Sequence, residues 1–337
     1  MKKYSKVLSL ALAFVMLFAL CACGAAEIHA AEPTAAPAAD APASEAPAET
    51  EAPAESQGVL DQIKADGVLY VTLSPDFAPM EFVDSSKDGQ EQYVGFDVTL
   101  AKYIADYIRV DLVIEPMSFD ACQTAVYTGS VPMSISGYSW TEERSENYEI
   151  SDYYYAGDNE TEQVILIKKT DADKYTSAED FSGVDVGAQN ASLQMNLLTS
   201  QLPDANPITI GDLGVGVLEL QNGSIEALAV AKGNAEMILD SNPDLMICPW
   251  EFEVAAEYEA NVILITKGET ALLNVVNEAL AKAYADGLYG TWYEDAVALA
   301  KSENAARSST SACSSASACS RSSTFSAVCN FSSIGIV

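Results

Sequence analysis

Between residues 57 and 305, short apolar runs alternate with stretches in which apolar residues recur at helical spacing. Leu69–Leu73 is typical of a buried strand, and residues 96–107 have the pattern of an amphipathic helix that Asp97 is placed to cap. The same pattern predicts further strands at 112–114, 131–136, 164–167, 184–187, 225–230, 245–247 and 262–266. It predicts further helices at 119–127, 192–199, 215–220, 233–239, 270–284 and 288–299. This alternation predicts parallel sheets in an α/β fold, and the length suggests two lobes.

The segments that follow predicted strands are the first candidates for a binding site. In open α/β sheets, ligands bind outside the carboxyl ends of the strands. Four such segments are 74–82, 136–144, 188–194 and 231–234. We therefore expect the functional side chains to come from these four places.

The most informative of these segments ends at Arg144. Thr141 has the character of a helix N-cap, and Arg144 follows it by one turn. A free carboxylate is best held by a bidentate guanidinium together with hydroxyl and backbone donors. Ser139 and the amides near Gly137 would complete such a set. The alternative is that Arg144 pairs with a neighbouring glutamate on the surface and contributes little.

Charge and composition exclude several classes of function. The formal net charge of −32 disfavours nucleic acid, which selects clustered Lys and Arg. The single histidine, His29, lies outside the predicted folded region. Catalysis by a Ser-His-Asp or Cys-His unit and a His-ligated zinc are therefore excluded there. We expect no enzyme activity, no metal and no cofactor.

Two cysteines, Cys122 and Cys248, lie in the predicted folded region, each in an apolar setting. Buried free thiols are the simpler interpretation. A disulfide between them requires a proximity that the sequence does not show.

The N-terminus indicates the compartment. Basic residues precede an apolar run over 7–20, which is too short for a typical membrane span and has the layout of a secretory signal. Leu20, Ala22 and Cys23 then match a lipoprotein signal, whereas Cys21 fits it poorly. We predict a signal peptide over 1–22 and acyl chains on Cys23 that hold the protein on the extracytoplasmic face of the cell membrane. The alternative is an ordinary cleaved signal.

Two segments have no pattern of a folded core. Residues 23–56 are rich in Ala, Pro, Glu and Ser and predict a disordered, lipid-anchored linker. Residues 306–337 are a Ser/Ala/Cys mixture without periodicity, which suggests a disordered tail or translation out of frame. The folded domain would occupy 57–305.

Several motifs, in order along residues 60–295, resemble the polar amino-acid-binding proteins of ABC importers. They are Tyr93-Val-Gly-Phe-Asp97, Met117-Ser-Phe-Asp120, Ile135–Arg144, Ile150-Ser-Asp-Tyr-Tyr-Tyr155, Val184-Asp-Val-Gly-Ala188, Leu220–Ala227 and Ala285–Tyr293. The resemblance is specific because it covers the whole domain in order, although each motif alone is weak.

The resemblance assigns roles to six residues. Arg144 would hold the ligand carboxylate, and Ser139, Ser192 and the backbone of Gly137 would assist it. Aromatic residues on either side of the ligand would be Phe77 and Phe119.

One position departs from the family pattern. The acidic residue that receives the ligand ammonium in the family corresponds here to Ala231, with Lys232 next. Either Asp76 or Glu81 takes that role, or the ligand is not an ordinary α-amino acid. Lys232 would then favour an anionic ligand group, unless it is simply a solvated surface lysine.

The resemblance implies a two-lobed periplasmic-binding-protein fold of type II-like topology. Lobe 1 would comprise 57–157 and 260–300, and lobe 2 would comprise 158–259, with hinge crossovers near 155–163 and 255–262. The implied function is capture of an amino acid or amino-acid-like carboxylate by a monomeric lipoprotein for an ABC permease. The alternatives are a ligand-sensing lipoprotein and a cyclic-acid dehydratase on the same fold.

Overall fold

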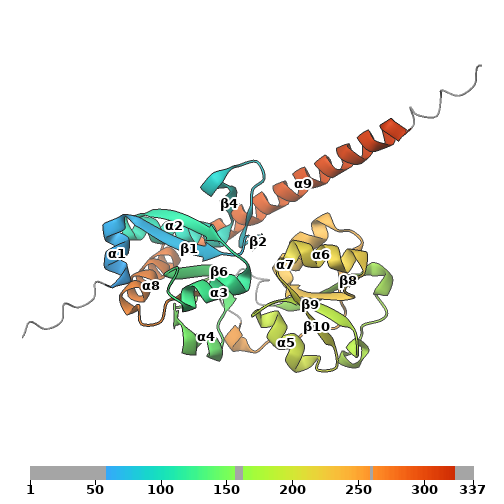
Figure 1. The fold of residues 1–337 in the computed structure, drawn as a ribbon, viewed down its shortest axis with the longest axis horizontal. Coiled ribbons are helices and arrows are strands. Elements are labelled where there is room, and N and C mark those ends of the chain that lie inside the picture. The colour runs from blue at the N-terminus through green and yellow to red at the C-terminus, as the bar shows by residue number, and fades with distance from the viewer. Residues whose placement is uncertain (1–57, 156–161, 259–260, 323–337) are drawn as a thin grey trace, which may run out of the picture. The chain divides into compact units, whose positions relative to one another are not determined.

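The computed structural model describes the backbone of residues 58–155, 162–258 and 261–322. The predicted signal peptide, Cys23 and the whole linker lie outside the described residues, as do 156–161 and 259–260 of the two predicted hinge crossovers. The described part contains two five-stranded sheets, each flanked by helices, which we call lobe 1 and lobe 2 (Figure 1). The fold is therefore mixed α/β with two lobes, as predicted.

Lobe 1 is built on a sheet of order β5-β1-β6-β13-β7. Its strands are β1 (Val68–Leu73), β5 (Asp111–Pro116), β6 (Met133–Ser139), β7 (Glu149–Ile150) and β13 (Asn261–Ile265). Its helices are α1 (Val59–Asp66), α2 (Phe96–Ile108), α3 (Phe119–Tyr127), α4 (Glu142–Asn147), α8 (Thr270–Ala285) and α9 (Leu288–Ser322). A small sheet of β2 (Asp76–Phe77), β3 (Glu81–Val83) and β4 (Tyr93–Val94) lies between β1 and α2 in sequence.

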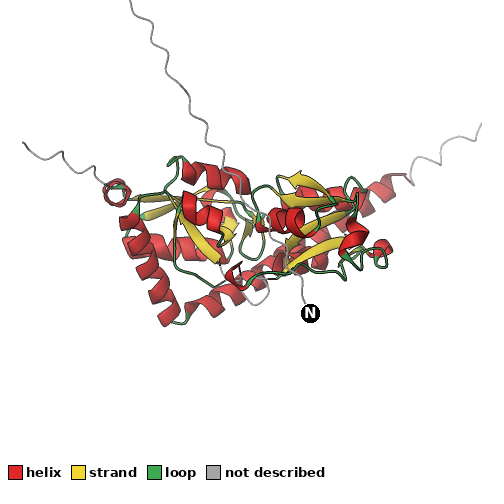
Figure 2. Ribbon diagram, turned by 90° about the horizontal axis from the view of Figure 1, so that it is seen from below, coloured by secondary structure: helices red, strands yellow, loops and turns green. Residues whose placement is uncertain are grey.

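Lobe 2 is built on a sheet of order β10-β9-β11-β8-β12. Its strands are β8 (Gln163–Lys168), β9 (Asp185–Gln189), β10 (Asn206–Ile210), β11 (Ala227–Ala231) and β12 (Leu245–Ile247). Its α-helices are α5 (Leu193–Gln201), α6 (Leu213–Asn222) and α7 (Lys232–Ser241). Figure 2 shows the strands of each lobe between helices.

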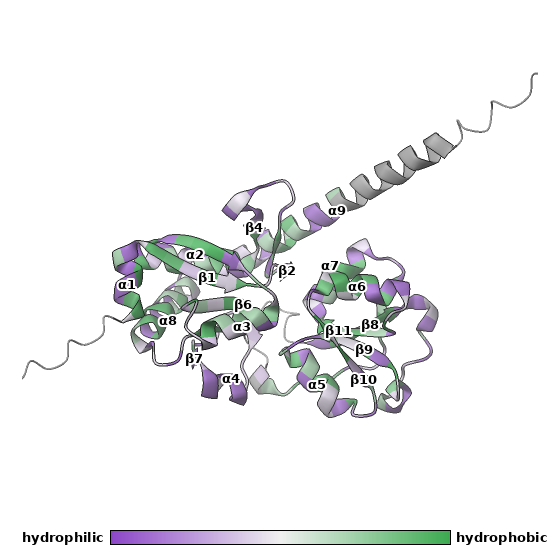
Figure 3. Ribbon diagram, in the orientation of Figure 1, coloured by the Kyte–Doolittle hydropathy of each residue, from purple (hydrophilic) through white to green (hydrophobic). Residues whose placement is uncertain are grey.

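Alternation of side chains across each strand produces a core on both faces of each sheet. Ile165 and Ile167 pack with α5, whereas Val164 and Leu166 pack with α6 and α7. In Figure 3, β8 and β11 of lobe 2 are largely hydrophobic and α4 in lobe 1 is hydrophilic. The near-continuous apolar runs that predicted these strands follow from burial on two faces.

The prediction of parallel sheets was only partly right, because each sheet is mixed. β1 runs parallel to β5 and β6, but β13 is antiparallel to β6. In lobe 2, β8 is likewise antiparallel to β11. β8 and β13 are the strands that follow the predicted crossovers, so no helical βαβ connection constrains their direction.

Three local predictions were wrong or incomplete. Asp97 does not cap α2: Gly95 is the N-cap residue, and the Asp97 carboxylate turns inward to other partners. Strand β10 and helix α1 were not predicted. Helix α9 continues to Ser322, so the described part of the expected disordered tail is helical, since a helix closes its backbone hydrogen bonds without a core. Residues 323–337 lie outside the described residues.

The described residues also show the state of the two cysteines and the character of the helices. Cys122 and Cys248 are buried free thiols, as the simpler interpretation predicted. Among the described helices, none combines the length and apolarity that a bilayer crossing requires.

Candidate functional site

Strand ends from both lobes meet around two small adjoining cavities of about 20 and 30 Å³. The lining comes from all four segments that the sequence singled out. It consists of Phe77, Phe119, Ser136, Gly137, Ser139, Arg144, Gln163, Gln189, Leu193, Gln194, Leu213, Ala229, Val230, Ala231 and Asn261. Five of the six predicted ligand-binding residues are therefore brought together, and we call this place the cleft site.

Arg144 lies at the centre of the cleft site and is 5% exposed. Thr141 caps α4 by accepting a hydrogen bond from the Arg144 amide at 3.1 Å, as predicted, which fixes the backbone that carries the guanidinium. Burial lowers the pKa of Arg144, yet an arginine stays charged at neutral pH. The alternative of a solvated surface arginine is thereby excluded.

The guanidinium of Arg144 meets neutral groups. It donates to the carbonyl oxygens of Ser139 at 2.6 Å and Ala191 at 2.9 Å, and to the side-chain oxygen of Gln123 at 3.3 Å. It also lies over the rings of Phe119 and Tyr138, at 5.8 and 5.2 Å from the centroids. No ion pair joins Arg144 to an acid of the described residues. A buried cation with only neutral partners is well suited to an anionic ligand.

Phe77 and Phe119 both line the two cavities. A Cβ atom on Gly137 would lie 2.8 Å from the Phe77 ring, and Gly137 has a φ of +55°. A glycine is therefore required there, because its missing side chain leaves room for Phe77. The Phe119 ring packs against that of Tyr138 in a tilted arrangement, with centroids 4.9 Å apart and an interplanar angle of 38°, so Phe119 contacts both the arginine and the cleft.

Two of the roles assigned by resemblance do not fit the geometry. The Gly137 N–H donates to Asp97 Oδ2 at 2.8 Å, so it is not free for a ligand. Ser192 does not line the cavities: it is 2% exposed and caps α5 by accepting from the Met195 amide at 3.1 Å. Its position after a strand matched the family, but the same position is also where a helix begins.

Glu81 and Asp97 form a fully buried carboxyl pair behind the cleft. Glu81 accepts from the Ser136 hydroxyl at 2.5 Å, and Asp97 accepts from the Tyr154 hydroxyl at 3.0 Å. Burial raises the pKa of Asp97 to about 7 and raises that of Glu81 well above its usual value, with the neighbouring carboxylate adding to the effect on Glu81. Sequence reasoning did not predict this pair.

Asp76 connects the two lobes. Its Oδ2 accepts from the Leu213 amide of α6 at 2.8 Å and from the Gln189 side chain at 3.0 Å, and its Oδ1 accepts from the Ser74 hydroxyl at 2.7 Å. Burial raises the pKa of Asp76 to about 6. The Asn190 side chain makes a similar link, donating to Asp120 at 3.1 Å.

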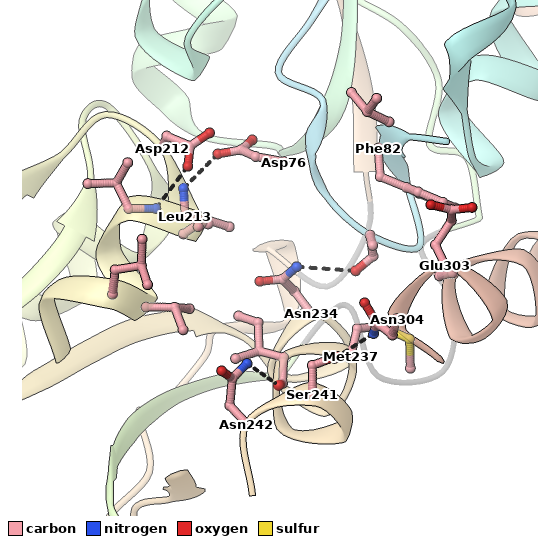
Figure 4. A pocket seen from close by; sticks show the side chains of 18 of the residues that line it. Asp76, Phe82, Asp212, Leu213, Asn234, Met237, Ser241, Asn242, Glu303 and Asn304 are labelled. Atoms are coloured by element: carbon pink, nitrogen blue, oxygen red, sulfur yellow. Dashed lines mark hydrogen bonds between the residues drawn. The ribbon is translucent and has the colours of Figure 1, made fainter. Parts of the chain in front are cut away.

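A larger hollow of about 920 Å³ lies on the other side of β2 (Figure 4). Asp76, Asp212 and Glu303 line it and no Lys or Arg does. Figure 4 shows the Asp76 carboxylate directed at the Leu213 amide. A carboxylate would meet only like charges there, whereas the two smaller cavities offer the buried guanidinium of Arg144.

The site offers no arrangement for metal binding or His-dependent catalysis. Within the described residues, no group of three or more His, Cys, Asp or Glu side chains is placed to hold a metal ion. The cavity lining contains neither an acid nor a histidine.

Comparison with known proteins adds a family and a set of relatives. Residues 69–296 match the model of bacterial extracellular solute-binding proteins, family 3. The chain is 26% identical over 66% of its length to a probable histidine-binding protein of Campylobacter jejuni, 82% of which is covered. It is 25% identical over 68% of its length to the L-cystine-binding protein TcyJ of Escherichia coli, 83% of which is covered.

The solved structures that resemble this chain include amino-acid-binding proteins. An amino acid ABC transporter substrate-binding protein from Streptococcus pneumoniae, bound to L-arginine, matches with a TM-score of 0.65 and 31% identity. The match covers 71% of this chain and 98% of that one. An ancestral amino acid-binding protein described as a precursor of cyclohexadienyl dehydratase matches with a TM-score of 0.60 and 29% identity, over 70% and 98% of the two chains.

Proposed function

Because the chain belongs to the bacterial extracellular solute-binding proteins, family 3, we propose that it captures an amino-acid-like carboxylate for an ABC importer. The observation that carries this proposal is Arg144, a buried guanidinium that lines the cleft and has no acid as partner among the described residues. The ligand carboxylate would supply the missing charge, with help from the Ser139 hydroxyl. Phe77 and Phe119 would contact the rest of the ligand.

Binding would couple to movement of the two lobes. Cavities of 20 and 30 Å³ each hold about one or two water molecules, so the cleft must widen to admit a ligand. The links from Asp76 to Leu213 and Gln189 would break on opening and re-form on closure. A hinge at the two crossovers would carry this motion, and the permease would bind the closed form.

The protein would act outside the cytoplasm as a monomer held to the membrane by acyl chains on Cys23. A binding protein is favoured over an enzyme because the described residues that line the cleft include no acid and no histidine. The buried carboxyls of Glu81 and Asp97 lie behind Ser136 and Gly137 and do not line it.

The test uses two Arg144 variants and a thermal-shift screen against amino acids and related carboxylates, followed by calorimetry. Arg144→Lys keeps the charge but loses the planar fork, so binding should weaken strongly. Arg144→Ala should cost on the order of 2–5 kcal/mol of binding free energy because the ligand carboxylate would be buried unpaired. Arg109→Ala, at an exposed arginine, is the matched control. Near-wild-type affinity in Arg144→Ala would refute the carboxylate-anchor role.

A further inference from the structure

Among the residues that the structure describes, the lining of the cleft site contains one cation and no carboxylate. Besides Arg144, its members are apolar or aromatic residues, glycine, serines and four carboxamides. Ala231, which ends β11, contributes only a methyl group to both cavities. An ammonium group desolvated there would find no ionised partner within the described residues.

One buried polar group of this lining lacks a hydrogen-bond partner among the described residues, and it is a donor. Asn261 is 4% exposed and lines the same cavity as Arg144, and its Nδ2 has no acceptor among the described residues. The Ser139 hydroxyl also lines that cavity and can donate or accept a hydrogen bond. A buried amide N–H without an acceptor is unfavourable. A ligand oxygen would satisfy it, whereas an ammonium would repel it.

Asp76 and Glu81, the two acids that the sequence offered as ammonium acceptors, do not line the cleft site. Both oxygens of Asp76 accept hydrogen bonds from protein donors. Glu81 is fully buried, and its pairing with Ser136 keeps it behind the cleft. Lys232, next to Ala231, forms an ion pair with Glu162 and so adds no free charge. Asp76 is engaged by donors of the other lobe, and Glu81 is buried and does not line the cavities. Neither acid that the sequence offered is therefore placed to receive a ligand ammonium.

Charge balance also favours a ligand with a single negative charge and no ammonium group. A monoanionic ligand neutralises the guanidinium of Arg144, whereas a zwitterion leaves one positive charge uncompensated in a desolvated cleft. We propose that the cleft selects carboxylates that carry a nearby uncharged carbonyl oxygen, as in 2-oxo acids and N-acylated amino acids, over free amino acids. This inference rests on the proposed function and specifies its ligand class.

The first test is calorimetry on the purified full-length protein in detergent with three matched ligand series. These are L-leucine, L-phenylalanine and L-glutamate, each with its 2-oxo acid and its N-acetyl derivative. In at least one series, the 2-oxo acid or the N-acetyl derivative should bind at least tenfold more tightly than the parent amino acid. Preference for the 2-oxo or the N-acetyl form identifies the subclass.

Two other results would count against the inference in distinguishable ways. If free amino acids bind as tightly as or more tightly than their derivatives and Arg144→Lys abolishes that binding, the ligand class is wrong but the proposed function stands. If none of these compounds and none of the twenty amino acids binds, both the ligand class and the proposed function are overturned.

A second test changes the protein. Ala231→Asp places a carboxylate in the cleft, and Ala231→Asn is the matched neutral control of the same size. The aspartate variant should bind a free amino acid at least tenfold more tightly than the asparagine variant does, with both variants matching wild type by circular dichroism. Equal affinities in two folded variants would show that the acid-free lining does not select the ligand, and would overturn the inference.

Discussion

Arg144 and Arg109 are the two arginines of residues 57–305, and their surroundings separate them. Arg109 is exposed at the C-cap of α2, whereas Arg144 is buried between two aromatic rings and three hydrogen-bond acceptors. The residue type alone does not identify a carboxylate anchor. Desolvation without an anionic partner separates Arg144 from Arg109 as the candidate anchor, because a buried charge is unfavourable until an anion pairs with it.

The aromatic residues of the cleft give a prediction at the same scale. Phe77→Ala and Phe119→Ala should each weaken ligand binding by roughly 1–3 kcal/mol through loss of buried aromatic contact. Phe119→Ala should have the larger effect because its ring also lies beneath Arg144. Calorimetry measures both. Tyr70→Ala, at an exposed tyrosine of β1, is the control, and unchanged affinity in both folded phenylalanine variants would remove them from the site.

At the scale of elements, short helices that begin directly after strands bring backbone amides to the cleft. Ser192 caps α5, Asp212 caps α6 and Thr141 caps α4, each by accepting from an amide three residues on. A polar side chain directly after a strand can therefore be a ligand-binding group or a helix cap, and the sequence alone does not separate the two roles. The hydrogen bond it makes distinguishes the two.

Ser192→Ala tests that distinction. The variant should lose about 1 kcal/mol of unfolding free energy, the usual cost of removing an N-cap, while ligand affinity changes less than twofold. Urea denaturation and calorimetry measure the two quantities. Ser200→Ala, on the same helix but bonded only to carbonyls of its own turn, should leave both nearly unchanged. A tenfold loss of affinity with normal stability in Ser192→Ala would restore its assignment as a ligand group.

The pair of Glu81 in β3 and Asp97 in α2 links elements of lobe 1 and predicts a pH dependence of stability. Both carboxyls have a raised pKa in the folded protein, about 7 for Asp97. The unfolded chain, with an ordinary pKa near 4, releases these protons first. The stabilisation that the pair adds to the free energy of unfolding is therefore complete below about pH 4 and falls as the pH rises towards 7. For each of the two protons, this free energy falls by up to about 1.4 kcal/mol per pH unit.

Glu81→Gln should flatten this slope, because the amide can donate to Asp97 without a titrating proton. Unfolding free energies of wild type and variant between pH 4.5 and 7 measure the difference. Asp84→Asn is a control, since hydrogen bonds from Ser86 and Lys87 lower the pKa of Asp84 and place its effect below this window. Parallel curves for wild type and Glu81→Gln would show that the pair is ionised throughout.

At the scale of the whole molecule, the chain combines a predicted membrane anchor with a two-lobed binding domain. The anchor prediction rests on Leu20, Ala22 and Cys23. Cys23→Ser should move the protein from the membrane fraction to the soluble fraction, because the acyl chains are lost. Fractionation with labelled fatty acid measures this. Cys21→Ser is the matched control. If Cys21→Ser loses the fatty-acid label and Cys23→Ser keeps it, Cys23 is not the acylated residue.

The sequence determined the elements and most of the site because both follow from local patterns. Apolar runs and helical spacing predicted strands and helices such as 69–73, 119–127 and 245–247, since burial on a sheet face or helix face imposes those periods. The rule that ligands bind at strand ends selected the four segments that line the cleft. Arg144 and its cap Thr141 were found in this way.

Only the tertiary structure decided what each side chain contacts. Asp97 has the sequence position of a helix cap but turns inward to Gly137 and Tyr154, residues 40 and 57 positions away. The antiparallel strands β8 and β13 owe their direction to a chain that crosses between lobes, which no local pattern records. The charge of the cleft is decided in the same way, because whether an acid such as Asp76 is free or engaged depends on donors from the other lobe. Hydrogen bonds between distant segments depend on three-dimensional proximity, and that is the information local sequence periodicity lacks.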